Sequence, residues 1–308
     1  MTCIGIDIGY GFTKTRSAEG GNRFPTAVSL MATEATFSEL APVRVNGKRY
    51  LVGEEAEREG GSLETRTSEF VASDAWLAIL GHALNAHKFE SGAIVLGVPP
   101  GVYSREYTER IIETIKASEI SAGNTGQYSL NGNIRIIPQG AGIFFRYIKY
   151  RPDDLKKNIA VIDIGHHTVD MTLFSHGRYV ETATESKEIG VAEVLDNIIK
   201  RFYREHRDTI GYKEAVDILT AGSVTYMGRQ WSVDAGDEVA RYSGQINSVI
   251  NRYLKKLSVK PDIGIVAGGG AEVIQRFIRS DHKLLMVTEP AMANAVGYWY
   301  YGMEVDRG

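Results

Sequence analysis

The sequence is poor in cysteine, and Cys3 is the only one among 308 residues. A single cysteine excludes an intramolecular disulfide framework and a zinc site built on cysteine ligands, so we expect Cys3 to fill a small space in a core. No apolar run reaches the roughly 18–20 residues that span a bilayer. The first residues lack the basic and long apolar regions of a secretory signal. These absences predict a cytoplasmic protein that does not bind membranes.

The sequence also lacks any concentration of positive charge. Its formal net charge is −3 at pH 7, and its paired lysines are isolated, as at Lys156-Lys157 and Lys255-Lys256. Charge-driven nucleic-acid binding needs clustered Lys and Arg to displace counterions. We therefore expect no direct binding of nucleic acid.

The remaining composition, 43% hydrophobic and 24% charged, suits a globular chain of two domains. Strand-like and helix-like segments are mixed in both halves, which indicates an α/β fold. In the first half we expect strands at residues 2–8, 12–17 and 93–98, a hairpin over 42–53 around Asn46-Gly47, a strand pair over 127–137 around Asn131-Gly132, and helices over 104–118 and 140–150. In the second half we expect strands at residues 159–164, 168–174, 179–184, 263–267 and 284–287, and helices over 190–206, 239–257, 271–279 and 291–301.

The two halves open with matching segments. IGIDIG begins at Ile4 and VIDIG begins at Val161, and each is followed by a segment that can return as the second strand of a hairpin. The match is short, so it indicates either a distant internal duplication or a chance similarity.

The first of these openings has the features of a phosphate-binding loop. Asp7 ends an apolar strand, where a carboxylate needs a partner, and Gly9 and Gly11 can expose backbone N–H groups to phosphate oxygens. Lys14 can add a positive charge or form a structural salt bridge. The alternative is a plain hairpin in which Asp7 caps its own turn.

The second opening repeats this design with Asp163, Gly165, Thr168 and Asp170. Two such loops facing each other would surround a triphosphate, and their carboxylates would hold Mg²⁺ through water because magnesium dehydrates reluctantly. The pair of loops is a more specific signal than either loop alone.

A third glycine segment, Gly268-Gly269-Gly270, stands between a predicted strand and a helix. Glycines let a ligand approach the backbone, and a helix N-terminus favours phosphate; the alternative is a flexible turn. The segment does not fit the dinucleotide pattern G-x-G-x-x-G, and the chain lacks the P-loop pattern G-x-x-x-x-G-K-S/T.

The order of these motifs resembles the superfamily of actin, heat-shock chaperones and hexokinase. PQGAG from Pro138 resembles its first interdomain connection, and EPAMANAVG from Glu289 resembles its second, with small residues for close helix packing. VNGKRYLVGEEA from Val45 and LGVPPG from Leu96 resemble the ParM/StbA plasmid-segregation actins and archaeal actin-like proteins.

The resemblance implies a fold of two duplicated ribonuclease H-like domains with a nucleotide cleft between them. Domain I would span residues 1–157, with a small hairpin subdomain over about 35–70 and a C-terminal helix over 290–308 that returns to it. Domain II would span residues 158–289.

The resemblance also implies roles for single residues. Asp7 and Asp163 would position hydrated Mg²⁺, Gln139 would orient the attacking water, and Asp170 would support the water or the metal shell. The other implied nucleotide-binding residues are Gly9, Tyr10, Gly11, Lys14, Gly165, His166 and Thr168 near the phosphates, Gly268, Gly269, Gly270 and Glu272 near the adenosine, and Glu193 near the ribose.

His166 departs from the family pattern, because relatives often have glycine at this position. Its side chain would restrict the approach of the backbone to a phosphate, reach a phosphate itself, or face solvent.

The function implied is slow Mg-ATP hydrolysis by an actin-like ATPase that forms head-to-tail filaments and uses an adaptor protein to move DNA or organise the cell. A monomeric small-molecule kinase is the alternative, but no sugar-kinase signature is present. A chaperone switch would need a peptide-binding domain after the ATPase core, whereas the sequence ends at Gly308. A membrane-associated division actin would need a terminal amphipathic basic segment. The sequence does not distinguish ATP from GTP or identify the adaptor.

Overall fold

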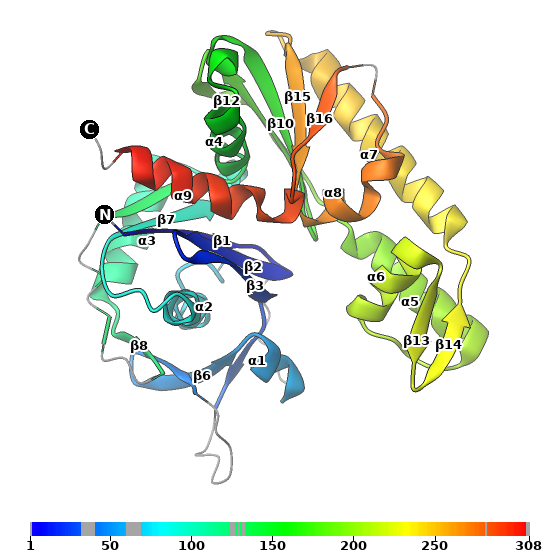
Figure 1. The fold of residues 1–308 in the computed structure, drawn as a ribbon, viewed down its shortest axis with the longest axis horizontal. Helices are drawn as coiled ribbons and strands as arrows, with labels where there is room; N and C mark the ends of the chain where they lie inside the picture. Colours follow the sequence, from blue (N-terminus) through cyan, green and yellow to red (C-terminus); the bar gives the residue numbers. More distant parts are fainter. Residues whose placement is uncertain are drawn as a thin grey trace. The chain divides into compact units, whose positions relative to one another are not determined.

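A computed structural model describes residues 2–31, 41–59, 69–123, 127–128, 130, 133–280 and 282–305. The chain forms two compact units, of which the first comprises Met1–Pro152 and Met292–Gly308 and the second comprises Asp153–Ala291. The last helix therefore belongs to the same unit as the N-terminal strands (Figure 1). Each unit mixes strands with helices, which confirms the predicted α/β class.

Two sheets form the first unit, and their strands are β1 (Cys3–Ile8), β2 (Phe12–Ser17), β3 (Gly20–Pro25), β4 (Val28–Leu30), β5 (Val43–Val45), β6 (Lys48–Val52), β7 (Ala93–Val98), β8 (Ile120–Ala122) and β9 (Ile134–Pro138). One sheet has the order β3-β2-β1-β7-β9, and the other has the order β4-β6-β5-β8. β1 is antiparallel to β2 and parallel to β7, which in turn is parallel to β9. The carboxyl ends of β1, β7 and β9 therefore meet at one edge of the sheet.

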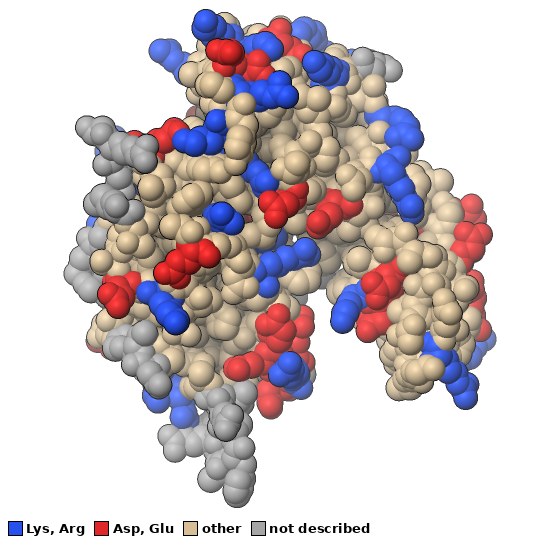
Figure 2. Space-filling view, in the orientation of Figure 1, with Lys and Arg blue, Asp and Glu red and all other residues tan. Residues whose placement is uncertain are grey.

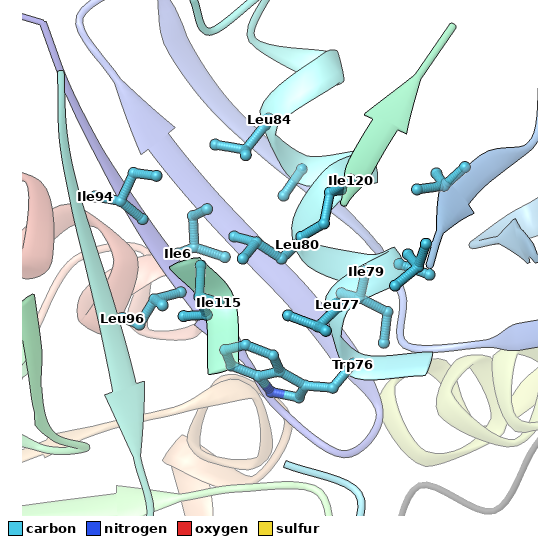
Figure 3. Packing of buried hydrophobic residues seen from close by; sticks show 14 of the residues in the cluster. Ile6, Trp76, Leu77, Ile79, Leu80, Leu84, Ile94, Leu96, Ile115 and Ile120 are labelled. Carbon is cyan, nitrogen blue, oxygen red and sulfur yellow. The ribbon is translucent and has the colours of Figure 1, made fainter. Parts of the chain in front are cut away.

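The helices of the first unit are α1 (Glu54–Arg58), α2 (Asp74–Ala86), α3 (Arg105–Ala117), α4 (Ala141–Tyr150) and α9 (Ala293–Val305), with a short 3₁₀ turn, η1 (Pro100–Val102). Ile6 of β1 and Leu96 of β7 pack with Leu80 of α2 and Ile115 of α3 in one buried core (Figure 3). These residues fix one face of the five-stranded sheet against α2 and α3.

The other face of β1 packs against α9. A Cβ atom added to Gly5 would lie 2.3 Å from the carbonyl oxygen of Ala295, so the helix lies directly on the strand. Cys3 is buried here, as predicted, and its Sγ lies 3.8 Å from the Trp299 carbonyl oxygen. Side chains alternate along a strand, so Asp7 belongs to the same face of β1 as Cys3 and Gly5.

The hairpin predicted over residues 42–53 is confirmed as β5 and β6. Its two turn residues, Asn46 and Gly47, have φ angles of 49° and 80°, as the type I′ turn of an Asn-Gly hairpin requires. The small subdomain predicted over about residues 35–70 lies partly outside the described residues, which omit 32–40 and 60–68.

The second unit contains the strands β10 (Asn158–Ile164), β11 (Val169–Ser175), β12 (Arg178–Lys187), β13 (Ser223–Tyr226), β14 (Arg229–Ser232), β15 (Ile263–Ala267) and β16 (Leu284–Met286). Its sheet has the order β12-β11-β10-β15-β16, and β13 and β14 form a separate hairpin. β10 is parallel to β15, whereas β11 is antiparallel to β10, so the unit repeats the strand plan of the first sheet.

Its helices are α5 (Ala192–His206), α6 (Tyr212–Ala221), α7 (Gly236–Lys256) and α8 (Gly269–Ile274), with 3₁₀ turns η2 (Pro152–Lys156), η3 (Gln275–Phe277) and η4 (Pro290–Met292) along the same stretch of chain. Phe202 of α5 and Ile246 of α7 are fully buried in a core that also contains Ile162 of β10. Among the described residues, none of the helices combines the length and apolarity needed to cross a membrane.

Two predicted elements differ from the structure. The strand pair over 127–137 is wrong in its first half: Gln127 and Tyr128 are not in a strand, and the Tyr128 N–H instead bonds the Ile120 carbonyl at 2.8 Å. The turn at residues 131–132 lies outside the described residues.

The helix predicted over 271–279 ends at Ile274 and continues only as η3. The Asn247 side chain explains the early end. Its Nδ2 donates to the Phe277 carbonyl at 3.1 Å, and its Oδ1 accepts from the Arg279 N–H at 2.7 Å. These backbone groups therefore have partners outside a helix.

Lys and Arg side chains are interspersed with Asp and Glu over the face drawn in Figure 2.

Candidate functional site

Asp7 of the first glycine loop is a buried carboxylate with two side-chain partners. It is 4% exposed at the end of β1, directly before the turn to β2. Its Oδ2 lies 3.5 Å from Lys14 Nζ, and its Oδ1 accepts a hydrogen bond from Gln139 Nε2 at 3.1 Å. The salt bridge allowed for Lys14 in the sequence therefore forms, and the loop does not depend on Asp7 to cap its own turn.

Backbone pairing positions Gln139 beside Asp7. Gln139 follows β9, and its N–H donates to the Val98 carbonyl at the end of β7 across 2.8 Å. The strand order β1-β7-β9 therefore brings residues that are 132 positions apart in sequence to one edge of the sheet.

The turn between β1 and β2 contains both predicted glycines and is tight at Gly9. The Gly9 N–H donates to the Phe12 carbonyl at 3.3 Å, and the Gly11 carbonyl accepts from the Thr26 N–H at 3.0 Å. A Cβ atom on Gly9 would lie 3.0 Å from that Phe12 oxygen and 3.1 Å from Lys14 Nζ. Tyr10 stands between the two glycines and is partly exposed.

The two predicted connecting segments meet within the first unit. The Gly140 N–H donates to Asn294 Oδ1 at 3.0 Å, which ties the start of α4 to the start of α9. A Cβ atom on Gly297 would lie only 1.6 Å from the Gly142 carbonyl oxygen. The small residues of these segments thus allow the close helix packing that the sequence predicted.

In the second unit, Asp163 and Asp170 face each other across the β10–β11 pair. They are 8% and 6% exposed. Thr168 Oγ1 donates to Asp170 Oδ2 at 2.8 Å, whereas Asp170 Oδ1 is buried and has no hydrogen-bond partner among the described residues. Burial raises the pKa of the Asp170 carboxyl, and the neighbouring hydroxyl groups of Ser186 and Thr168 partly oppose that rise.

The second glycine loop is fixed by the segment that leads into α5. The Gly190 N–H donates to the His167 carbonyl at 2.9 Å, and the Ala192 N–H donates to the His166 carbonyl at 2.8 Å. A Cβ atom on Gly190 would lie 2.1 Å from the His166 carbonyl oxygen, so only glycine fits this position. Glu193 is exposed in the first turn of α5, next to this anchored loop.

His166 contacts two aromatic rings and is only partly exposed. Its ring centroid lies 4.4 Å from that of His167 and 5.2 Å from that of Tyr212. The Tyr212 hydroxyl in turn donates to Asp196 Oδ1 of α5 at 2.7 Å. His166 is therefore a loop residue packed against α6 rather than a fully solvent-facing side chain.

The third glycine segment lies against the second loop. Gly268 has a φ angle of 99°, and a Cβ atom there would lie 2.3 Å from Asp163 Oδ1. A Cβ atom on Gly270 would lie 2.9 Å from the Gly165 carbonyl oxygen, whereas one on Gly269 would meet nothing within 4 Å. Glu272 follows in α8 and is exposed. Within the second unit, the structure thus brings Asp163, Asp170 and two glycine segments together.

The carboxylates suit a magnesium ion that keeps most of its water. Among the described residues, no three His, Cys, Asp or Glu side chains come together as ligands for a metal ion. Magnesium usually binds one or two carboxylates and substrate phosphates while it retains several waters. Within the second unit, buried Asp163 and Asp170 fit that donor set.

Three positions near these loops were missed as site residues in the sequence. The sequence predicts Gly190 as the first residue of a helix over 190–206, whereas α5 begins at Ala192 and leaves Gly190 in the preceding segment. Asn294 was noted only as part of a small-residue segment, although its side chain holds the Gly140 N–H. Tyr212 had no sequence signal, because its contact with His166 depends on the tertiary fold.

Two family models match different parts of the chain. "Actin like proteins N terminal domain" matches residues 5–142, and "Archaeal actin homologue MreB-like, C-terminal" matches residues 161–280. A curated protein described as an archaeal actin homolog, from Thermoplasma volcanium, is 24% identical over 329 aligned residues, which cover 97% of this chain and 98% of the relative.

Solved structures share the fold over the whole chain. Ta0583, an archaeal actin homolog, matches with a TM-score of 0.77 and 18% identity over 100% of both chains. A ParM subunit from a 15-stranded filament of Clostridium botulinum matches with a TM-score of 0.76 and 20% identity, over 98% of this chain and 99% of the ParM. These matches and the two family models confirm the resemblance predicted from the motifs: the chain matches actin-type family models over residues 5–142 and 161–280 and shares the fold of archaeal actin-like and ParM structures.

Proposed function

We propose that this protein binds ATP with Mg²⁺, hydrolyses it slowly and assembles into head-to-tail filaments when ATP is bound. Its matches to actin-type family models over residues 5–142 and 161–280 support nucleotide binding. The archaeal homolog Ta0583 has also been solved in complex with ADP, and a ParM of Bacillus thuringiensis has been solved with ATP.

The observation that carries the proposal is the carboxylate of Asp170, which is buried and has a hydrogen-bond partner at only one of its two oxygens. Its Oδ2 accepts from Thr168, but its Oδ1 has no partner among the described residues. A buried carboxylate oxygen without a hydrogen bond is unfavourable in free energy. A bound water, or the hydration shell of a cation, would supply the missing donor at this oxygen.

The glycine loops are suited to phosphate oxygens. Backbone N–H groups in a tight glycine turn can surround an anion, and Gly9, Gly11 and Gly165 keep side chains out of these turns. Asp7 and Asp163 would hold Mg²⁺ through its water shell. When bound, Mg²⁺ neutralises the charge of the phosphate oxygens.

Gln139 would orient the water that attacks the terminal phosphate. Its amide is already held by the hydrogen bond to Asp7. An amide can position a water but cannot take its proton at neutral pH. Catalysis would therefore depend on positioning and charge neutralisation, which predicts slow turnover.

Slow hydrolysis suits a timer for assembly. ATP would favour one conformation of the chain and hydrolysis would release it, and contacts that repeat head to tail produce open filaments. We further propose a cytoplasmic location and an adaptor protein that links the filament to DNA or other cargo.

Light scattering and sedimentation test the proposal directly. Purified protein at several concentrations receives Mg-ATP, Mg-ADP or no nucleotide, and phosphate release is followed in the same samples. We expect scattering and pelleting to rise with Mg-ATP above a threshold concentration. Hydrolysis without assembly would contradict the filament and favour the monomeric kinase, whereas neither hydrolysis nor nucleotide binding would contradict the whole proposal.

A further inference from the structure

The second unit contains a pocket of 590 Å³ that uses none of the predicted nucleotide-binding residues. It lies between the C-terminal end of α6, the connection from β14 to α7, the first turns of α7 and the segment that follows α8. Its volume falls within the roughly 300–1,000 Å³ of pockets that hold small molecules. The pocket is large enough for a ligand of drug-like size.

Apolar side chains form much of the pocket lining. Leu219 of α6, Val233 before α7 and Val239 of α7 line it and are almost completely buried. Phe277 adds an aromatic ring. Such a lining favours an apolar ligand body, because burial removes apolar surface from water.

The charged side chains that line the pocket carry more positive than negative charge. Arg276 and Arg279 are exposed lining residues, and Asp234 is the acidic one. Among the residues that the structure describes, neither arginine has a carboxylate within ion-pair distance. The two guanidinium groups therefore remain available to an anion.

Backbone carbonyls hold both arginines without neutralising them. Arg279 Nη1 donates to the carbonyls of Arg276 and Ile278, each at 2.9 Å, and Arg276 Nη2 lies 3.5 Å from the Leu219 carbonyl. Asp234 is also engaged, since its Oδ1 accepts from the Gly236 N–H at 2.9 Å. The excess charge of the pocket is thus positive and held in place before any ligand binds.

We propose that this pocket binds a small amphipathic anion, with an apolar body against Leu219, Val239 and Phe277 and a single carboxylate, sulfonate or phosphate group at Arg276 and Arg279. Guanidinium groups pair with such oxyanions through charge-assisted hydrogen bonds. The proposal is independent of ATP hydrolysis, because the pocket and the glycine loops share no residue.

Two related dyes test the site. Anilinonaphthalene sulfonate carries an apolar body and one sulfonate, and N-phenyl-1-naphthylamine has the same rings without the charge. Fluorescence titration of the full chain should show saturable binding of the anionic dye at one site per chain. The neutral dye should bind about tenfold or more weakly, since it makes no bond to the guanidinium groups. Equal affinity for the two dyes would overturn the proposal.

Substitutions of lining residues test whether the dye binds in this pocket. Replacing both arginines with glutamine (R276Q/R279Q) should weaken the anionic dye about tenfold, whereas Arg252→Gln, at an exposed position of α7 outside this pocket, should leave its affinity unchanged. Ala240→Trp, at an exposed lining position, should fill the pocket and abolish binding of both dyes while the melting temperature is retained. Unchanged dye affinity in these pocket variants would overturn the proposal.

Two alternative explanations, dye binding at the nucleotide site and a second copy of the chain in the pocket, give different experimental results. If excess ADP displaces the anionic dye, the dye occupies the nucleotide site and the proposal is overturned. If nucleotide-free protein forms dimers that Ala240→Trp abolishes, a second copy of the chain fills the pocket, which also overturns a small-ligand site. Failure of ATP hydrolysis with intact dye binding would remove the proposed function and leave this inference standing.

Discussion

Gln139 Nε2 donates a hydrogen bond to Asp7 Oδ1 at 3.1 Å, where the parallel strands β1, β7 and β9 end. The same aspartate lies 3.5 Å from Lys14 Nζ, so both carboxylate oxygens have a polar neighbour. The Gln139 amide therefore has a defined orientation before a nucleotide binds. That pre-organisation is what a water-positioning residue needs.

Gln139→Ala should slow hydrolysis far more than it weakens nucleotide binding. Loss of one positioning group lowers kcat by about 10²-fold, while the ADP dissociation constant should change by less than about threefold. Phosphate release and a fluorescent ADP analogue measure the two quantities. Gln245→Ala, at an exposed position of α7, is the control. Equal losses in rate and affinity would contradict the role.

Asp170→Asn should make the free energy of unfolding less dependent on pH. Because burial raises the pKa of Asp170 above its ordinary value of 3.8, its contribution to stability is present at low pH and is lost as pH rises through the folded-state pKa. The stability of the variant relative to the natural protein should therefore increase as pH rises above 3.8 and through the folded-state pKa of Asp170.

Urea denaturation of nucleotide-free protein at several pH values measures this difference, with the exposed Asp217→Asn as control. A pH-independent difference would show that the Asp170 carboxyl is not destabilised by burial. The same variant should lower kcat for ATP by about 10²-fold or more, because the charge at Oδ1 is removed.

Much of the fold could be predicted because local patterns agree with the tertiary structure. The strand at Ala93–Val98 is a continuous apolar run, and all six residues are buried between two parallel neighbours, β1 and β9. Ser104 accepts from the Tyr107 N–H at 3.2 Å, as an N-cap serine before a helix should. The pairing of Asp163 with Asp170 follows from two strands joined by a short glycine turn.

In the elements that the sequence did not predict, the local pattern does not indicate the structure that forms. α2 is buried at nine of its thirteen residues, so its sequence has little of the periodicity that marks an amphipathic helix. The hairpin of β13 and β14 turns through Met227 and Gly228, a dipeptide with a weaker turn signal than Asn-Gly.

At the candidate site, the sequence predicts which residues are present but not which side chains contact one another. The carboxylates and glycines stand out in the sequence because each follows an apolar strand. By contrast, the contacts of Gln139 with Asp7 and of His166 with Tyr212 join residues far apart in sequence. Such contacts depend on the strand order and on helix packing, which no local pattern specifies.

Gly297→Ala should destabilise the first unit. The new Cβ atom would lie 1.6 Å from the Gly142 carbonyl oxygen, so α4 and α9 would have to move apart. Overpacking of this kind lowers the free energy of unfolding by about 1–3 kcal/mol or more. Gly244→Ala is a matched control. Gly244 is exposed on α7, and a Cβ atom there would meet nothing within 4 Å. That control should stabilise the helix by about 0.5–1 kcal/mol. Thermal melts that rank the variants in the opposite order would contradict the packing.

Gly268→Ala and Gly269→Ala should separate structural strain from ligand contact. At Gly268 the φ angle is 99° and the new Cβ atom would lie 2.3 Å from Asp163 Oδ1, so alanine should displace that carboxylate and reduce stability by about 1–3 kcal/mol. At Gly269 a Cβ atom would meet nothing within 4 Å, and stability should change by less than about 1 kcal/mol.

If the adenosine lies against this segment, Gly269→Ala should still weaken ADP binding, because the added methyl group occupies space that only a ligand would fill. Chemical denaturation without nucleotide and ADP titration distinguish the two effects. A Gly269→Ala variant with unchanged ADP affinity would show that the nucleoside does not approach this residue, whereas equal destabilisation by both variants would contradict the geometry of the turn.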